Sequence, residues 1–212
     1  MKPVFICLYG ETCAGKSTLG QSLGSRLGYR YISFGDLKRD AIKKQTKLGT
    51  QIQLLLDSEC PIPAELGYEV IKEAIGDNEI NIISGYPISL DEFRAIAHRG
   101  FVAGVIELHI DEIILIVRLG QRRECSICHL PGVIGDSCPK HNVSMIQRND
   151  VGIDELLKRR RLYRQRIEPF LRMEEIRKIP NLCLDSSSLT REAVASQAEA
   201  WIRSTLNHRR AE

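Results

Sequence analysis

A glycine-rich stretch near the N-terminus constrains the fold of this chain more than any other feature. Residues 10–18 read Gly-Glu-Thr-Cys-Ala-Gly-Lys-Ser-Thr and match the pattern G-x-x-x-x-G-K-[ST] at every fixed position. An apolar, β-prone run precedes them at residues 4–9, and leucines at helical spacing follow them. A strand, a glycine loop and a helix in this order point backbone N–H groups and a helix N-terminus at an anion. The stretch therefore predicts a binding site for a nucleoside triphosphate.

The loop supplies a complete set of candidate phosphate ligands. We expect contacts from Gly10, Glu11, Thr12, Cys13, Ala14, Gly15, Lys16, Ser17 and Thr18. The Lys16 ammonium would reach the β- and γ-phosphates, and the Ser17 hydroxyl would bind Mg²⁺. The alternative is a glycine-rich turn with an incidental lysine, which the agreement between motif and flanking pattern disfavours.

Bulk composition narrows the function classes. A chain of 212 residues is expected to form one domain. Its net charge of +3 is too small to indicate nucleic-acid binding, and no apolar run is long enough to span a membrane. The N-terminus has no signal-peptide pattern, so we expect a cytoplasmic protein whose seven cysteines are reduced or metal-bound.

Alternating strand and helix patterns predict the architecture. The expected strands are residues 4–9, 29–32, 78–84, 101–109 and 181–185. The expected helices are one after the glycine loop, three at about residues 33–44, 49–56 and 63–75, and others at 90–99, 111–119, 152–178 and 189–206. This order predicts an α/β fold of the P-loop NTPase type, with a five-stranded parallel sheet and helices on both faces. The carboxyl ends of the strands would gather residues 10–18, residues 84–87 and His109 around one crevice.

Between residues 120 and 150 the alternation of strand and helix patterns stops, and this segment contains a Cys/His cluster. Its members are Cys125, Cys128, Cys138 and His141, arranged as two pairs. Two such pairs close together predict a tetrahedral zinc site, and four protein ligands make it structural rather than catalytic. Two alternatives stay open, namely unliganded thiols and a site in which His129 replaces His141.

Four stretches together resemble a known family. They are the loop at residues 10–18, Ser-Phe-Gly-Asp-Leu-Lys-Arg at 33–39, Gly-Tyr-Pro at 85–87, and a series of arginines from Arg118 to Arg159. In order and spacing the chain resembles the adenylate kinases and close nucleoside-monophosphate kinases over nearly its whole length. The resemblance implies ATP with Mg²⁺ as donor, a small-molecule acceptor and a monomeric protein.

The resemblance also implies a domain plan and roles for the arginines. It divides the chain into a core (1–33, 66–120 and 151–212), a helical acceptor-binding insertion (34–65) and a lid with the Cys/His cluster (121–150). Lys16 and the lid arginines would be catalytic: Arg122, Arg148 and Arg159. Arg118 would stack on the donor base. The alternative is a solvated basic helix face, which we favour for Lys158, Arg160, Arg161 and Arg164.

The acceptor side departs from the family pattern. The positions implied to bind the acceptor are Phe34, Asp36, Arg39, Gly85, Tyr86, Ile88 and Glu92. Phe34 stands where the family has threonine, Ile88 where it has arginine, and Glu92 where it has glutamine. Ser84 replaces the acid that normally orients water on Mg²⁺, and Ser17 is a candidate to compensate.

The expected function is therefore transfer of the ATP γ-phosphate to a nucleoside monophosphate or a closely related acceptor. One alternative is a kinase for a non-standard small molecule or modified nucleoside, because Ile88 removes one phosphate-gripping charge. Another is an ATP-binding regulatory protein with little turnover, which Ser84 would favour.

Overall fold

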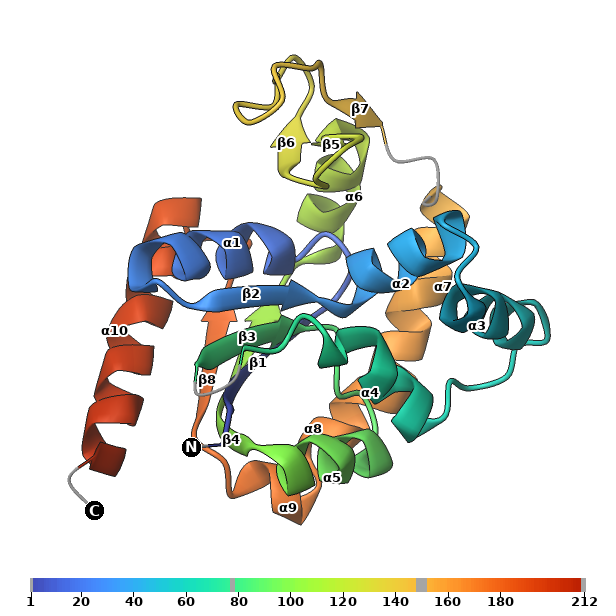
Figure 1. Ribbon diagram of the computed structural model, residues 1–212. Helices are drawn as coiled ribbons and strands as arrows, with labels where there is room; N and C mark the ends of the chain where they lie inside the picture. Colours follow the sequence, from blue (N-terminus) through green and yellow to red (C-terminus); the bar gives the residue numbers. More distant parts are fainter. Residues whose placement is uncertain (1, 77–78, 148–151, 211–212) are drawn as a thin grey trace.

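A five-stranded parallel sheet forms the centre of the protein, with strand order β2-β3-β1-β4-β8 (Figure 1). The computed structural model describes residues 2–76, 79–147 and 152–210. The strands are β1 (Val4–Gly10), β2 (Arg30–Ser33), β3 (Ile80–Ser84), β4 (Phe101–His109) and β8 (Asn181–Asp185). Every neighbouring pair is parallel, so all five strands end at the same edge. The predicted fold is confirmed.

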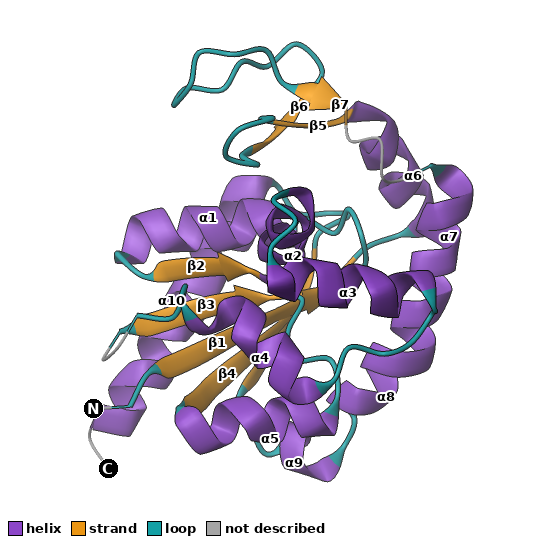
Figure 2. Cartoon of the chain, turned by 45° about the vertical axis from the view of Figure 1, so that its right-hand side comes forward, coloured by secondary structure: helices purple, strands orange, loops and turns teal. Residues whose placement is uncertain are grey.

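Helices cover both faces of this sheet (Figures 1 and 2). On one face, α1 (Lys16–Leu27) and α10 (Arg191–Arg210) pack on a buried cluster that includes Leu8 and Ile106. On the other face, α4 (Ala64–Lys72) and α5 (Leu90–Arg99) pack on a second cluster that includes Phe5. The strands alternate their side chains between these two clusters, which is the pattern expected for a sheet buried on both sides.

Three helices follow β2, as predicted. They are α2 (Phe34–Lys43), α3 (Lys47–Asp57) and α4, and the first two lie beyond the carboxyl ends of the strands (Figure 2). Ser33 caps α2 by accepting from the Asp36 N–H at 3.3 Å, and Thr46 caps α3 by accepting from the Gly49 N–H at 3.0 Å. These caps fix where the insertion leaves the sheet.

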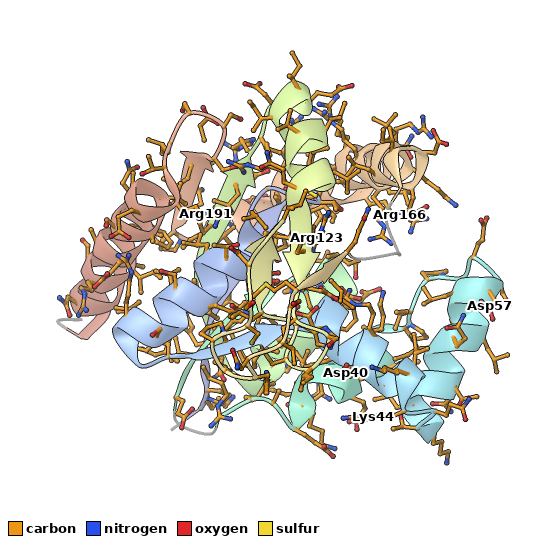
Figure 3. All side chains as sticks on the ribbon, turned by 90° about the horizontal axis from the view of Figure 1, so that it is seen from above. Asp40, Lys44, Asp57, Arg123, Arg166 and Arg191 are labelled. Atoms are coloured by element: carbon orange, nitrogen blue, oxygen red, sulfur yellow. The ribbon has the colours of Figure 1, made fainter. Side chains whose placement is uncertain are left out.

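A small antiparallel sheet stands above the main one (Figure 1). Helix α6 (Glu112–Gln121) leads into β5 (Arg122–Glu124), which pairs with β6 (Pro131–Val133) and β7 (Ile146–Gln147). Seen from above, this small sheet lies between α1 and α2 (Figure 3). From it, the His129 Nε2 atom approaches the Asp40 Oδ1 atom of α2 to 2.9 Å. A polar contact therefore links the segment that forms the small sheet to α2.

The prediction of one helix over residues 152–178 is wrong at its C-terminal end. The structure has α7 (Ile153–Leu162), a π-helical turn η1 (Tyr163–Ile167), α8 (Glu168–Leu171) and then a separate α9 (Glu174–Arg177). Met173 adopts an extended ψ of 145° and breaks the path. Phe170 and Ile176 are both buried in the same cluster, yet on a straight helix they would point about 120° apart. The break lets both reach the core.

None of the helices within the described ranges is both long and apolar enough to cross a membrane.

Candidate functional site

The glycine loop joins the end of β1 to the start of α1. Gly10 has a φ of 143°, and a side chain there would come within 2.6 Å of the Leu108 carbonyl oxygen. Gly15 has a φ of 98° and lies immediately before the first residue of α1. Glycine is needed at both positions. The N-terminus of α1 therefore opens into the space above the sheet edge, where it can bind an anion.

Lys16 lies at the base of this space. Its Nζ atom donates to the carbonyl oxygens of Gly10 at 2.7 Å and Glu11 at 2.8 Å. Burial, helped by the nearby Arg122 guanidinium, lowers the pKa of Lys16 from 10.5 to about 8. The ammonium is thus held by carbonyl oxygens of its own loop. An anion bound beside it would favour the charged form and raise the pKa of Lys16 again.

A cavity of about 410 Å³ extends from the loop. Among the described residues it is lined by five arginines: Arg39, Arg118, Arg122, Arg159 and Arg191. The loop residues 12–18 form its floor, and Leu189 and Ala195 contribute an apolar wall. Cations on several sides and an apolar wall suit a ligand that carries both phosphates and a flat base.

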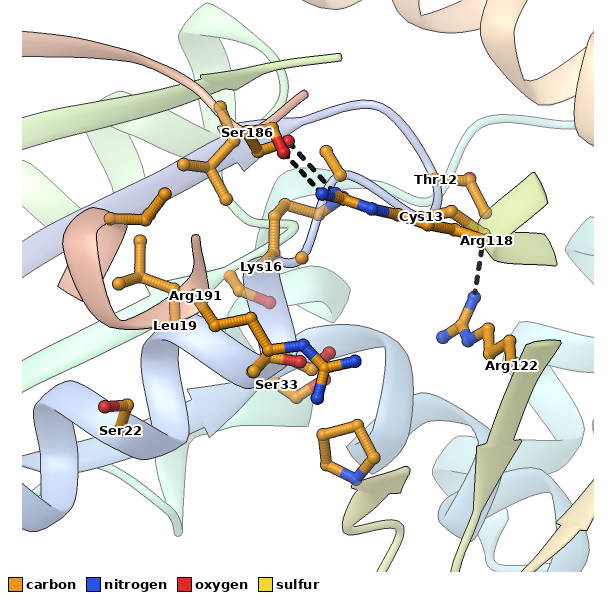
Figure 4. Close-up of a pocket in the computed structure, with 18 of the residues that line it drawn as sticks. Thr12, Cys13, Lys16, Leu19, Ser22, Ser33, Arg118, Arg122, Ser186 and Arg191 are labelled. Atoms are coloured by element: carbon orange, nitrogen blue, oxygen red, sulfur yellow. Dashed lines mark hydrogen bonds between the residues drawn. The ribbon is translucent and has the colours of Figure 1, made fainter. Parts of the chain in front are cut away.

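The predicted arginines reach this cavity from different elements (Figure 4). Arg118 on α6 donates to the Ser186 hydroxyl at 3.2 Å and to the Ser186 carbonyl oxygen. Arg122 begins β5, and its guanidinium lies 3.8 Å from the Cys13 sulfur. Arg159 on α7 pairs with Glu155 at 2.8 Å and lines the same cavity. The prediction for Arg148 lies outside the described residues.

The predicted acceptor residues separate into two groups. Asp36, Arg39 and Gly85 line the cavity, and Arg39 forms an ion pair with Asp36. The other four do not line it: Phe34, Tyr86, Ile88 and Glu92. Asp36, Arg39 and Gly85 therefore share a cavity with the phosphate loop, whereas the other four predicted acceptor residues lie outside its lining.

Packing explains why that second group is withdrawn. Phe34 stacks on Tyr86 with ring centroids 5.3 Å apart, and both side chains are buried. Glu92 is also buried and accepts from the Ile88 backbone N–H at 2.6 Å. Burial raises the pKa of Glu92. These contacts hold the rings of Phe34 and Tyr86 and the Glu92 carboxylate in the packed interior, and none of the three lines the cavity.

Hydroxyl groups stand where a carboxylate would orient Mg²⁺. Ser17 and Ser84 both line the cavity. The Tyr31 hydroxyl shares a hydrogen bond of 3.1 Å with the Ser84 hydroxyl. Hard divalent cations accept neutral oxygen ligands, so Ser17 fits the role, but this cluster adds no negative charge.

The interpretation of Arg160 as part of a solvated face is wrong. Arg160 is only 8% exposed, and its guanidinium lies 3.0 Å from Glu11 of the phosphate loop and 3.0 Å from Glu112. Glu11 thus directs its side chain away from the cavity and anchors the loop to α7, while its carbonyl oxygen accepts from Lys16. The sequence did carry a signal, because Leu156, Arg160 and Tyr163 share one buried face at i, i+4, i+7 spacing.

Arg191 is a cavity residue that sequence reasoning missed. It is the first residue of α10, which follows the last strand after the short turn at residues 186–190, and it lines the cavity at the carboxyl edge of the sheet (Figure 4). The signal for it was positional, since a basic residue at that point in a parallel α/β fold faces the ligand edge.

The Cys/His cluster forms a compact group of metal-ligating atoms in the small-sheet segment. The ligand atoms of Cys125, Cys128, Cys138 and His141 all lie within 4.8 Å of one another. Backbone N–H groups of Cys128 and Ile127 lower the pKa of Cys125 to about 6, which favours the thiolate form that binds metals. The ring nitrogens of His129 instead face Asp40 and Glu124, so the geometry favours His141 over His129.

Comparison with known proteins agrees with this geometry. No family model matches the chain. The chain is similar to the adenylate kinases. It is 28% identical to "Adenylate kinase" of Chlamydia trachomatis serovar D over 196 residues, covering 80% of this chain and 78% of that protein. The adenylate kinase of Fervidobacterium nodosum is 28% identical over 76% of this chain and 81% of its own length. That of Bacillus subtilis is 28% identical over 78% of this chain and 83% of its own.

In this relative of the adenylate kinases, the low pKa of Lys16 leads to a pH test. The free lysine loses its proton near pH 8, whereas a bound triphosphate raises its pKa and keeps it charged. Lys16 should therefore leave the affinity for ATP nearly constant below about pH 7 and lower it as the pH rises through about 8, by about tenfold between about pH 7.5 and pH 9. Isothermal titration calorimetry in buffers of different ionisation enthalpy should show uptake of about one proton at the higher pH.

Two variants serve as controls for this test. Cys13→Ser removes the neighbouring ionisable thiol and should keep the pH dependence, while Lys16→Met should lose it. A pH-independent affinity in the unmodified protein would contradict the assignment of Lys16 as the titrating group.

Proposed function

We propose that the protein transfers the γ-phosphate of ATP to a nucleoside monophosphate or a closely related acceptor. The observation that carries this proposal is one cavity that holds the phosphate loop, Lys16 and five arginines at the carboxyl edge of a parallel sheet. The similarity to adenylate kinases over most of the chain supports the same reaction.

The residues around the cavity would have different roles in phosphoryl transfer. This reaction needs in-line positioning and positive charge on the transferred oxygens rather than covalent help from the protein. Lys16, Arg122 and Arg159 would neutralise that charge, and Arg148 would join them. Arg39 would hold the acceptor phosphate. A phosphate acceptor is already a nucleophile and needs no general base.

The donor end is assigned in the same way. Arg118, fixed by Ser186, would lie against the donor base beside the apolar wall of Leu189 and Ala195. The Ser17 hydroxyl would hold Mg²⁺ together with the ATP phosphates, and the metal would supply charge neutralisation between the β- and γ-phosphates.

The lid and the helical insertion are proposed to close over the substrates. The proposed division is a core (1–33, 66–120 and 151–212), an acceptor-binding insertion (34–65) and a lid (121–150). The contact between His129 and Asp40 supports a coupling between the last two parts. We propose that the enzyme acts as a cytoplasmic monomer.

A second candidate is a kinase for a non-standard small-molecule or modified-nucleoside acceptor. The stacking of Phe34 on Tyr86 favours it, because both rings are buried in that stack and neither lines the cavity where an acceptor base would bind. Ile88, with no charge to offer a second phosphate clamp, favours it as well.

A structural zinc ion is proposed for the Cys/His cluster. Three thiolates and one imidazole are a complete tetrahedral donor set for zinc. The small sheet has short strands and exposed apolar side chains such as Ile127 and Ile134, so burial contributes little to its stability. A metal would hold it together.

Removal of the Lys16 charge tests the reaction itself. Lys16→Met should lower kcat for phosphotransfer by about a hundredfold or more, since it deletes a donor aimed at the transferring group. The assay couples ADP formation to a dehydrogenase and screens nucleoside monophosphates, nucleosides and small metabolites. Lys72→Met, an exposed lysine on α4, is the matched control and should keep full activity. Turnover unaffected by Lys16→Met would refute the catalytic role.

Substitution at Ile88 tests the acceptor. Ile88→Arg should raise kcat/KM for AMP by about tenfold if the position is a weakened monophosphate clamp, because a bidentate guanidinium–phosphate contact would be restored. Ile88→Met keeps an apolar side chain of similar size and should leave the value unchanged. An arginine variant with no gain on AMP would favour the second candidate.

Metal analysis tests the proposed zinc ion. After extensive gel filtration the protein should retain about one zinc per chain, and Cys128→Ser or His141→Asn should release it and lower the melting temperature. His129→Asn should retain it. Retention in the His141→Asn variant, or none in the parent, would overturn the ligand assignment.

A further inference from the structure

We propose a second, exchangeable transition-metal site at the end of β4 and β8, formed by Glu107, His109 and Cys183. One ligand atom from each of the three lies within 4.8 Å of the others. The site is separate from the Cys/His cluster of the small sheet, because its residues come from the main sheet. It also shares no ligand with the proposed phosphotransfer reaction.

Strand register brings these three residues together. Glu107 and His109 are two positions apart on β4, so their side chains point to the same face of the sheet. β8 runs parallel to β4 with Cys183 directly opposite Glu107. In the described part of the chain, β8 is an edge strand of the sheet. His109 and Cys183 are exposed and Glu107 is partly exposed, so a metal ion has access.

The carboxylate is already oriented for this role. The Tyr163 hydroxyl of η1 donates to the Glu107 Oε1 atom at 3.0 Å, and the side chain of Tyr163 is buried. The other carboxylate oxygen, Oε2, lies 3.6 Å from the His109 Nε2 atom. A hydrogen bond that fixes one oxygen of a ligating carboxylate is the usual outer-shell support of a metal site.

Among the residues that the structure describes, no fourth protein ligand is in place. Asp185 lies opposite His109 in the register. Its Oδ1 atom accepts from the Ser187 N–H at 2.8 Å, and its Oδ2 atom accepts from the Ser188 hydroxyl at 2.7 Å. Three ligands leave one coordination position for water or another small ligand. His109 also lines a second cavity of about 340 Å³, which gives room for one.

The donor atoms indicate the class of metal. A thiolate, an imidazole and one carboxylate suit Zn²⁺ and its analogue Co²⁺, whereas Mg²⁺ and Ca²⁺ prefer oxygen ligands alone. With three ligands instead of four, this site should bind more weakly than the Cys/His cluster and exchange its metal faster.

The test is titration of the full chain, first freed of bound metal by dialysis against a strong chelator, with Co²⁺ in the presence of a competing chromophoric chelator. The parent should bind two equivalents, of which the weaker gives the thiolate-to-cobalt absorption of a single cysteine. Cys183→Ser and His109→Gln should each abolish the weaker equivalent and keep the stronger one. A circular dichroism spectrum and a melting temperature equal to those of the parent show that the variants are folded. Cys60→Ser and His98→Gln, which also remove exposed side chains, should behave as the parent does.

A further variant tests the orienting hydrogen bond. Tyr163→Phe should keep the weaker equivalent but reduce its affinity about tenfold or more. The proposal is overturned if the parent shows no second equivalent, or if that equivalent survives in both Cys183→Ser and His109→Gln. Loss of the stronger equivalent alone would count against the Cys/His cluster and not against this site.

Discussion

Parallel pairing of β1 with both of its neighbours is the constraint on which the rest of the molecule depends. It sends the ends of all five strands to one edge, so the segments that follow them face a common space. Gly10 ends β1 against the Leu108 carbonyl of β4, an approach that a side chain would prevent. On its other side β4 pairs with β8, and that register sets Glu107 beside Cys183. Both proposed sites are therefore consequences of one strand arrangement.

Charge is distributed to match that arrangement. Cations that lie far apart in the sequence, from Lys16 to Arg191, line one cavity, and several of them are held by a local partner. Lys16 bonds to loop carbonyl oxygens, Arg118 to Ser186 and Arg159 to Glu155. Behind the loop, Glu11 faces Arg160, so the loop's own carboxylate is turned away from the space that phosphates would occupy. A polyanion would thus meet positive groups that are already positioned.

Local sequence patterns predicted the strands, most helices and the loop, because periodicity and glycine spacing act over a few residues. The range of α5 and that of β8 agree with the prediction residue for residue. The division near Met173 and the burial of Arg160 were not foreseen, since both depend on partners far away in the chain. The Cys/His cluster was found from spacing, yet the choice between His129 and His141 needed the position of Asp40. Glu107, His109 and Cys183 carry no sequence pattern, because only strand register joins them.

The two ends of the main cavity differ in a way that bears on the acceptor. Leu189 and Ala195 form an apolar wall at the proposed donor end. At the proposed acceptor end Gly85 lines the cavity, while Phe34 and Tyr86 stack on each other in the buried interior. An acceptor that reaches Arg39 either displaces Phe34 or presents only a small head group to the cavity. Displacement would expose a buried aromatic side chain at a cost of about 2 kcal/mol, which a bound base could offset by stacking on Tyr86 itself. The Phe34 ring and the base of an acceptor would thus compete for the same face of Tyr86. An acceptor with a base can bind in this way only if its base stacks on Tyr86 more favourably than Phe34 does.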